Sequence, residues 1–283
     1  MDFSNLNSLS IPSCLTKTEK DYKTIIASFL ETRSLTTLEI NLGGYPNDVL
    51  YQLGKWFEAL VSLTSLNLRG PLRSIHHCIR DLNPITSISS FGLSQDLTIH
   101  HPKGQTVHLV PLFAAIFPNL HTLHLENNND TLPKMVTLDD LMSFRQRPLQ
   151  ALDLINCLKS TKLANDIVEI LRVLPTLERL WIEGGKVSAR YILPIISSSA
   201  PSLQDLTLPL RSPGVSDGSA VNEVVCPLRC LSAPSFKNIA DTRSHVRNII
   251  KLFPSLTTLS KRTREEGESV TVNVDMSRYR SED

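Results

Sequence analysis

The chain has 283 residues and a mass of 31.6 kDa, enough for one large domain or two small ones. Its composition, 41% hydrophobic and 20% charged, is globular and excludes global disorder. The 29 basic and 28 acidic residues leave a formal net charge of +1, which gives no net attraction to nucleic acid or to an anionic membrane.

The N-terminal sequence and the cysteines indicate a compartment. Residues 1–5 lack the basic segment of a signal peptide, and no apolar run is long enough to span a membrane. The five cysteines, an odd number without disulfide spacing, predict reduced and mostly buried thiols. We therefore expect a cytoplasmic or nuclear protein.

A seven-residue pattern, x-Leu-x-x-Leu-x-(Leu/Ile), recurs along the chain. Its first apolar positions in ten copies are residues 6, 35, 63, 85, 120, 149, 177, 203, 228 and 256, at a mean interval of about 28 residues. The fourth copy, over residues 84–90, carries isoleucine in place of leucine. Because side chains alternate along a strand, the second and third apolar residues share one face, and each copy predicts a short strand.

Apolar residues at helical spacing fill the intervals between these strands. We expect helices over residues 24–30, 49–61, 107–117, 167–174 and 191–196, a helix start at Asp139 and Asp140, and a last helix that includes residues 243–251. Four intervals end at a proline directly before the next strand: Pro118, Pro175, Pro201 and Pro254. Proline stops a helix and favours extended backbone, so each repeat is predicted to contain one strand, one loop and one helix.

A single strand–helix repeat cannot cover its own apolar face, so neighbouring repeats must stack around a shared leucine core. The predicted fold is an α/β solenoid, a horseshoe with a parallel sheet on its concave side and helices on its convex side. We expect the solenoid to cover residues 1–260. Residues 261–283 are predicted to form a C-terminal capping strand, over 269–274, and a flexible tail.

With this pattern the chain resembles the leucine-rich-repeat proteins of the ribonuclease-inhibitor-like class. In that class the eighth position after the first leucine is Asn or Cys, whose side chain satisfies loop backbone groups. This chain has Cys14, Asn128 and Cys157 there. Other repeats carry different residues at this position: Gly43, Pro71, Gly185, Arg211 and Phe236. The ladder is therefore incomplete, and those loops must be satisfied in another way.

The irregular repeats, the cysteines at the eighth position and the Pro-x-Leu strand starts are most similar to the repeat half of fungal F-box/leucine-rich-repeat proteins. Those proteins are substrate receptors of cullin-type ubiquitin ligases. The resemblance implies substrate recognition for an SCF-type ligase, with the ligase adaptor as a further partner. The N-terminal F-box of that family is not visible, because a strand pattern begins at residue 5.

The third and fifth positions of each copy, such as Ser87 and Ser89 in the fourth, are predicted to face the concave side. Most carry small hydroxyl side chains, and larger groups gather in the middle copies. An aromatic residue beside an arginine is the composition of a binding hot spot. We predict that a protein partner binds at Trp181, Arg179, His124, Asp153 and Asp205. The alternative is that the indole covers a loop and the charges form a solvated face.

The sequence indicates neither a metal site nor a catalytic one. His121 and His124 are three residues apart, so on a strand they point to opposite faces and cannot share an ion. No nucleophile elbow, P-loop or dinucleotide-binding motif is present. We therefore expect a non-catalytic protein that takes no metal or cofactor and binds neither nucleic acid nor membrane.

Two other functions stay open at this point. One is the regulation of an enzyme: a GTPase activator would use a loop arginine, such as Arg69 or Arg211, and a ribonuclease-type inhibitor would need a strongly acidic concave face. The near-neutral concave positions argue against the inhibitor. The other is a degenerate paralogue without retained function, which the incomplete ladder and the missing F-box favour.

Overall fold

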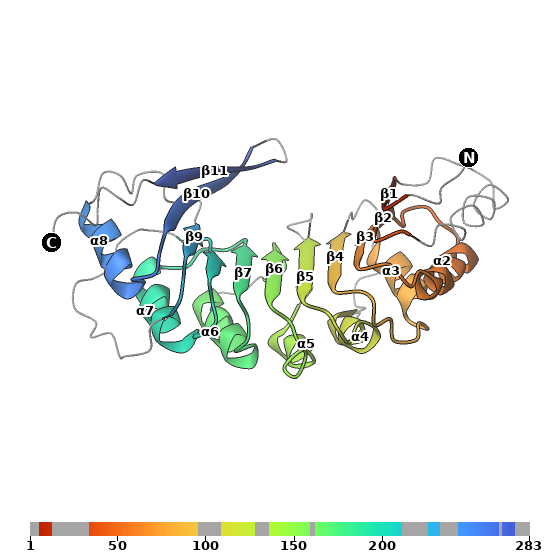
Figure 1. Cartoon of the computed structure of the whole chain (residues 1–283), viewed down its shortest axis with the longest axis horizontal. Coiled ribbons are helices and arrows are strands. Elements are labelled where there is room, and N and C mark those ends of the chain that lie inside the picture. Colours follow the sequence, from red (N-terminus) through yellow and green to blue (C-terminus); the bar gives the residue numbers. More distant parts are fainter. Residues whose placement is uncertain are drawn as a thin grey trace. The chain divides into compact units, whose positions relative to one another are not determined.

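The computed structural model of the chain describes residues 6–12, 34–95, 109–127, 136–158, 162–210, 226–232, 243–265 and 268–274. The chain folds into two compact units, Met1–Leu149 and Gln150–Asp283. Element labels follow Figure 1. The helix predicted over residues 24–30 lies outside the described residues, and the predicted division at residue 260 stays a prediction.

The first unit alternates strands and helices. Its strands are β1 (Ser8–Ile11), β2 (Thr37–Asn41), β3 (Ser65–Arg69), β4 (Ser90–Gln95) and β5 (Thr122–Asn127). Its helices are α2 (Asn47–Ala59), α3 (Leu72–Ile79), α4 (Leu109–Ile116) and α5 (Leu138–Met142). The strands are parallel and pair in chain order.

The second unit is built in the same way, except that no helix is described between β8 and β9. Its strands are β6 (Ala151–Ile155), β7 (Arg179–Glu183), β8 (Asp205–Thr207), β9 (Cys230–Ser232) and β10 (Thr258–Glu265), all parallel, followed by β11 (Glu268–Val274). Its helices are α6 (Leu163–Val173), α7 (Ala189–Ser199) and α8 (Arg243–Leu252). Strand β11, which includes residues 269–274, runs antiparallel to β10.

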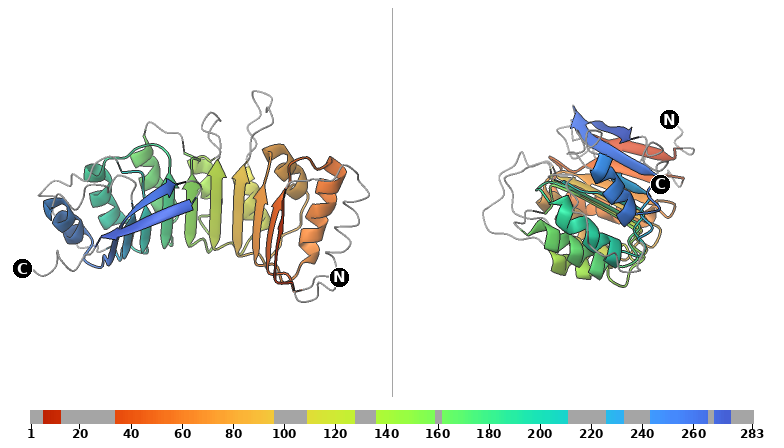
Figure 2. Two further views of the ribbon diagram at one scale, coloured as in Figure 1. Left: turned by 90° about the horizontal axis from the view of Figure 1, so that it is seen from above. Right: turned by 90° about the vertical axis from the view of Figure 1, so that its left-hand side faces the viewer.

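In both units the helices cover one face of the sheet (Figures 1 and 2), and we call the other face the open face. In the second unit the hairpin of β10 and β11 crosses in front of this face in the left view of Figure 2. Five parallel strands in each unit, with described helices between all consecutive strands of a unit except β1 and β2 and β8 and β9, confirm the predicted α/β leucine-rich-repeat solenoid. The helices predicted from spacing correspond to α2, α4, α6 and α7, the predicted last helix corresponds to α8, and the predicted helix start at Asp139 lies in α5. Helix α3 was not predicted, although Ile75, Cys78 and Ile79 are buried at helical spacing.

Aligned apolar side chains form the core beneath each sheet. In the first unit the register places Leu38, Leu66, Phe91 and Leu123 side by side, and each is fully buried. The same position in the second unit holds Leu152, Leu180, Leu206, Leu231 and Leu259, all 1% exposed or less. Burial of one such side chain contributes about 1.5–3 kcal/mol, so the leucine pattern itself selects the register.

One carbonyl at the entry of each strand binds two successive N–H groups of the next repeat. The carbonyl oxygen of Asn7, for example, accepts hydrogen bonds from the backbone N–H groups of Thr36 and Thr37. Including this example, eight such carbonyl oxygens each accept two backbone hydrogen bonds, four in each unit, with N···O distances of 2.7–3.0 Å. Threonine hydroxyls add to it, since Thr64 Oγ1 donates to the Thr36 carbonyl at 3.2 Å.

The predicted register of the fourth repeat is wrong by three residues. The pattern begins at Ile88 rather than Ile85, and Ser65 and Leu66 pair with Ser90 and Phe91. The reason is packing: the Phe91 ring lies 4.6 Å from that of Phe113 and 4.9 Å from that of Phe117, centroid to centroid, and fills the core. The open-face residues of this repeat are therefore Ser90 and Gly92, in place of Ser87 and Ser89.

Helices α2 and α3 approach closely at Gly54. A Cβ atom at this position would lie 2.1 Å from the Cys78 carbonyl oxygen and 3.1 Å from Leu82 Cδ2. The carbonyl belongs to helical backbone and cannot move aside cheaply. Only glycine therefore permits this contact between the helices.

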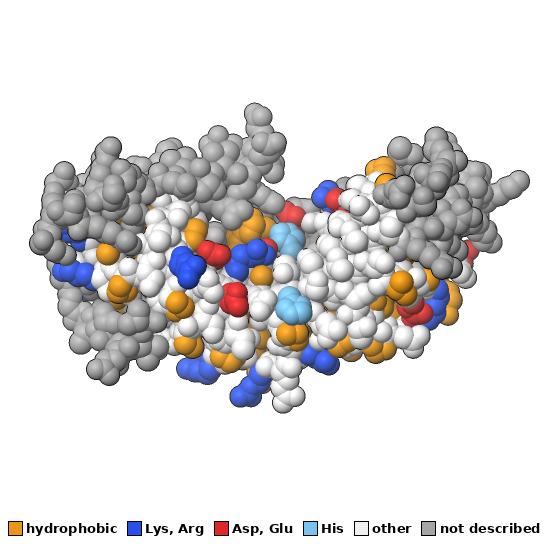
Figure 3. Space-filling model, in the orientation of Figure 1, with side chains coloured by type: hydrophobic (Ala, Val, Ile, Leu, Met, Phe, Trp, Pro, Cys, Tyr) orange, Lys and Arg blue, Asp and Glu red, His pale blue; other side chains and the backbone are white. Residues whose placement is uncertain are grey.

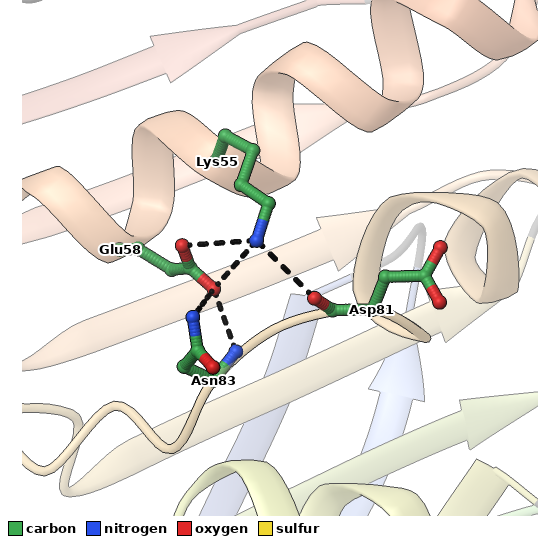
Figure 4. A network of polar contacts seen from close by, with 4 residues as sticks. All are labelled: Lys55, Glu58, Asp81 and Asn83. Atoms are coloured by element: carbon green, nitrogen blue, oxygen red, sulfur yellow. Dashed lines mark hydrogen bonds and ion pairs between the residues drawn. The ribbon is translucent and has the colours of Figure 1, made fainter.

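A polar network ties the end of α2 to the chain after α3 (Figure 4). The Lys55 ammonium lies 3.1 Å from Glu58 Oε1 and also donates to the Asp81 carbonyl oxygen at 3.3 Å. The Asn83 backbone N–H donates to Glu58 Oε1 at 2.6 Å. Burial alone raises the pKa of Glu58, but the hydrogen bonds from Asn83 and the charge of Lys55 outweigh it, so this pKa lies below its ordinary value of 4.5.

The four described cysteines are free thiols, as the sequence predicts. Cys78, Cys157 and Cys226 are buried and Cys230 is partly buried. Burial raises the pKa of Cys78 and, against a smaller opposing effect of a Leu228 backbone hydrogen bond, that of Cys226 to about 11. Cys14 lies outside the described residues. Among the described helices, none is both long and apolar enough to cross a membrane.

We predict that Gly54→Ala destabilises the protein, although alanine is the better helix former. The clash with the Cys78 carbonyl should lower the free energy of unfolding by about 1–3 kcal/mol. Gln52→Ala, at an exposed position of the same helix, is the control and should change it by less than about 0.5 kcal/mol. Urea unfolding measures both, and a stabilised Gly54→Ala variant would contradict the contact.

The network also predicts a pH dependence. Because folding lowers the pKa of Glu58, its carboxylate stabilises the fold above pH 4.5, and this contribution is lost as the pH falls through the folded-state pKa. Glu58→Gln should therefore be less stable than the wild type at neutral pH, and the difference should shrink below pH 4.5. Urea unfolding at a series of pH values tests this, and a difference that stays constant would refute it.

Candidate functional site

The open face of the second unit carries the third and fifth residues of each repeat, aligned across the strands. The third positions are Ala151, Arg179, Asp205, Cys230 and Thr258, and the fifth positions are Asp153, Trp181, Thr207, Ser232 and Ser260. Four of the five predicted site residues therefore lie on three neighbouring strands, β6 to β8. Figure 3 shows acidic and basic side chains gathered over these strands.

Arg179 and Asp153 form an ion pair across two strands. The Arg179 Nη2 atom lies 3.3 Å from Asp153 Oδ2. Ala151, the residue directly opposite Arg179 in the register, is small, so the arginine side chain crosses diagonally toward Asp153. The two partners differ in exposure: the side chain of Arg179 is 45% exposed and that of Asp153 only 8%. Asp153 therefore holds Arg179 in place, and the guanidinium is the group that solvent reaches.

Trp181 lies on β7, between two neighbouring strands of this face. The register places it between Asp153 on β6 and Thr207 on β8. The residue is partly exposed, while its indole Nε1 atom is buried. The exposed part of the indole is therefore ring carbon and not the N–H donor, so a partner would meet it by stacking or apolar contact.

Two further carboxylates border Trp181 on the open face. Asp205, on β8, is exposed and lies opposite Arg179 in the register. Glu183 follows Trp181 by two residues on β7, so both point to the same face. Within the described residues, the Asp205 carboxylate makes no hydrogen bond or ion pair. Its charge is therefore not compensated by a direct contact in that part of the chain.

Toward β9 and β10 the open face offers little to a partner. Thr207, Ser232 and Ser260 are all 9% exposed or less. The hydroxyls of Ser232 and Ser260 are hydrogen-bonded to each other at 2.5 Å. Among the fifth positions of this face, those of β8 to β10 are therefore buried, and Trp181 on β7 is partly exposed.

His124, the fifth predicted residue, belongs to the first unit. It is partly buried on β5, opposite Gly92. The open face there carries a hydroxyl at the third position of every strand: Ser8, Thr37, Ser65, Ser90 and Thr122. An ion pair of 2.8 Å joins Arg69 to Glu39.

Two of the eighth positions have a local hydrogen bond, at Cys157 and at Gly43. Cys157 Sγ donates to the Ile155 carbonyl oxygen at 3.3 Å, which is the role the resemblance assigns to it. At Gly43 the backbone N–H donates instead to Asn41 Oδ1, at 3.0 Å. Sequence reasoning missed Asn41 because the acceptor lies two residues before the expected position. Cys14, Asn128 and Arg211 lie outside the described residues.

The described histidines, cysteines and carboxylates do not come together in any group of three or more that could hold a metal ion. His76 and His77 are neighbours on α3, with ring centroids 6.2 Å apart. Burial, followed by the charges of Arg80, Arg73 and His76, lowers the pKa of His77. Because α3 lies on the helix-covered side of the sheet, both histidine rings are on that side and not on the open face.

No protein-family model matches the chain, and no curated protein matches it. Among solved structures, it is similar to the leucine-rich-repeat-containing protein LegL7 of Legionella pneumophila, with 16% identity over 89% of this chain and 72% of that one, and a TM-score of 0.47. A chain of the TLR13–ssRNA13 complex is 17% identical over 93% of this chain and 44% of its own, with a TM-score of 0.36. The fold assignment rests on the repeating geometry described above.

The two aspartates of this face should differ in their effect on stability. We expect Asp153→Ala to lower the free energy of unfolding by about 1–3 kcal/mol, because it removes a nearly buried carboxylate and its bond to Arg179. Asp205→Ala, at an exposed position on the same face, should change it by less than about 0.5 kcal/mol. Urea unfolding distinguishes the two, and equal effects would show that Asp153 is not a structural partner.

Proposed function

We propose that this chain is a non-catalytic protein-binding module, and that its partner binds the open face of the second unit. The observation that carries this proposal is the partly exposed indole ring of Trp181, beside the half-exposed guanidinium of Arg179, on a sheet. Tryptophan and arginine contribute most often to the binding energy of protein interfaces. A single exposed apolar residue is common on protein surfaces and does not indicate binding. Trp181, however, lies next to Arg179 on the same face of β7.

The setting of these residues favours binding. Both are on β7, which is paired on each side, by β6 and by β8. The Arg179 side chain is also fixed by Asp153. Such preorganisation reduces the conformational entropy that a partner would have to remove on binding. In this proposal Trp181 and Arg179 make the main contacts, Asp205 adds a charge, and Asp153 orients the arginine. The role of His124 stays a prediction.

We propose further, from the resemblance to fungal F-box/leucine-rich-repeat proteins, that the partner is a substrate of a ubiquitin ligase and that the ligase adaptor is a second partner. The bond from Cys157 to the Ile155 carbonyl and the prolines before the strands support the resemblance. The proposed compartment is the cytoplasm or the nucleus.

The rival function of a GTPase activator finds less support. A catalytic arginine must be able to reach a bound nucleotide, whereas Arg69 is paired with Glu39 at 2.8 Å. An activator would have to break this pair. Arg211, the other candidate, lies outside the described residues.

Affinity purification from the native cell, with mass spectrometry, tests the proposal. We expect Trp181→Ala to lose, by tenfold or more, at least one protein that the wild type captures. Tyr191→Ala is the matched control, because Tyr191 is an aromatic residue, 69% exposed, on helix α7 of the same unit, and its loss should leave capture unchanged. Circular dichroism and urea unfolding establish that both variants are folded.

The other outcomes are equally informative. A ligase adaptor and a cullin among the captured proteins would support the ligase proposal, and their absence beside a Trp181-dependent partner would remove only that part. Equal loss in both variants, or none in either, would place the interface elsewhere. If the folded wild type captures no protein at all, the degenerate paralogue is the better account.

A further inference from the structure

We infer that the outer face of helix α3, in the first unit, is a second protein-binding surface, and that an acidic segment of a partner binds there to Arg73, His76 and His77. This inference goes beyond the proposed function, because it concerns a helix of the other unit and does not depend on Trp181. It is carried by the arrangement of residues around α3, their exposure and the balance of charge.

The residues around α3 divide into an apolar side and a basic side. Three apolar residues are buried: Ile75, Cys78 and Ile79. The opposite side carries only arginine and histidine: Arg73, His76, His77 and Arg80. These four are spaced i, i+3, i+4 and i+7, so they lie on one face of the helix, spread over about 10 Å of its length. We call these four residues the basic strip.

The basic strip is accessible in the folded chain. Arg73 is exposed, and His76 and His77 are partly exposed. The Arg80 side chain is 46% exposed. A partner could therefore reach all four side chains without any rearrangement of the helix.

Little negative charge from the described residues compensates the basic strip. Asp81, directly after α3, lies 3.1 Å from Arg80 Nε and is itself 54% exposed. Arg73 forms no ion pair with a carboxylate of the described residues. The next helix, α4, has no charged residue at all. An incoming carboxylate is therefore the complementary charge at the Arg73 end of the strip.

Helix α2, which packs beside α3 (Figure 1), does not change this balance. Its charged residues are Asp48, Lys55 and Glu58. Lys55 and Glu58 form an ion pair with each other at 3.1 Å. Asp48 lies in the first turn of α2, where a carboxylate interacts favourably with the helix dipole.

The start of α3 adds to the attraction for an anion. Pro71, which precedes the helix, donates no side-chain cap, and the first turn contains no acidic residue. The first N–H groups of a helix carry a partial positive charge. Arg73 is the second residue of α3, so its guanidinium and the helix dipole act in the same direction at this end.

The basic residues also repel one another, and His77 shows this. Burial, followed by the charges of Arg80, Arg73 and His76, lowers the pKa of His77, against a smaller opposite effect of Asp81. Carboxylates of a partner would relieve this repulsion and raise the pKa. Binding then favours protonated His77, so the affinity for an acidic segment should rise as the pH falls toward the His77 pKa, which lies below 6.5 in the free chain.

The strip favours an acidic protein segment over other partners. A basic segment would be repelled by Arg73 and Arg80, and an apolar segment would have to bury their charges, which is costly. Nucleic acid binds through many phosphate contacts, whereas this strip is short and the chain has a net charge of only +1. A segment with a few carboxylates matches the strip in both sign and length.

NMR of the full-length chain provides the test, through the ring C–H signals of its eight histidines. His76→Gln and His77→Gln variants assign the two signals of interest. The probes are acetylated, amidated tetraglutamate, tetra-arginine and tetraserine peptides. At about pH 6 we expect only tetraglutamate to shift the His76 and His77 signals saturably. Its affinity should fall roughly threefold or more at about pH 7.5, and several-fold when salt rises from about 50 to about 200 mM.

A pair of arginine variants makes the test specific. Arg73→Gln should weaken tetraglutamate binding by roughly threefold or more. Arg190→Gln is the matched control and should leave binding unchanged. Arg190 is likewise exposed and the second residue of its helix, α7, which also starts without a side-chain cap, but no histidine accompanies it there. Circular dichroism and urea unfolding establish that both variants are folded.

Four results would overturn the inference. They are an equal loss of affinity in Arg73→Gln and Arg190→Gln, a saturable shift of the two histidine signals by tetra-arginine, an affinity for tetraglutamate that is the same at both pH values, and no saturable shift by tetraglutamate up to millimolar concentration. None of these results bears on the proposed interface at Trp181, which the capture experiment tests separately.

Discussion

The shared carbonyl at each strand entry is the interaction on which the rest of this fold depends. Its two bonds from N–H groups of the next repeat join backbone atoms, with threonine hydroxyls adding to some of them, so the contact recurs wherever the chain returns in register. It sets the strands parallel and aligns the third residues, and from there the alternation of side chains sends leucine to the core and the third and fifth residues to the open face. The core and the candidate site are thus two results of one repeated contact.

Because the two N–H bonds of this contact do not involve the third and fifth residues' side chains, these residues on the open face are free to vary. In the first unit the third residue of each repeat carries a hydroxyl group. In the second unit the third residues include Arg179 and Asp205. On the open face of the second unit, however, the fifth-position residues Thr207, Ser232 and Ser260 are buried. The region around Trp181 therefore differs from the rest of the open face in which side chains it carries and in how exposed they are, while the backbone geometry is the same.

The sequence predicted the fold because its signal is repeated: nine of ten strand registers follow from the leucine spacing. The fourth failed because Ile85, Ile88, Phe91 and Leu93 allow two registers, and only packing against Phe113 decides between them. For the site, alternation along β7 predicted that Trp181 and Arg179 share a face. It could not predict that Asp153 is nearly buried and bound to Arg179, because this depends on the small Ala151 of the neighbouring strand.

Strand β11 has a consequence for how such a chain can grow. It runs antiparallel to β10, so a strand–helix repeat placed after Val274 would meet a neighbour of reversed direction. Within each unit, the shared entry carbonyl joins all the parallel pairs of neighbouring strands. An added repeat would lack this contact with β11. Duplicated repeats could therefore be inserted between existing repeats, but not added after β11. The hairpin of β10 and β11 thus ends the series of stacked repeats.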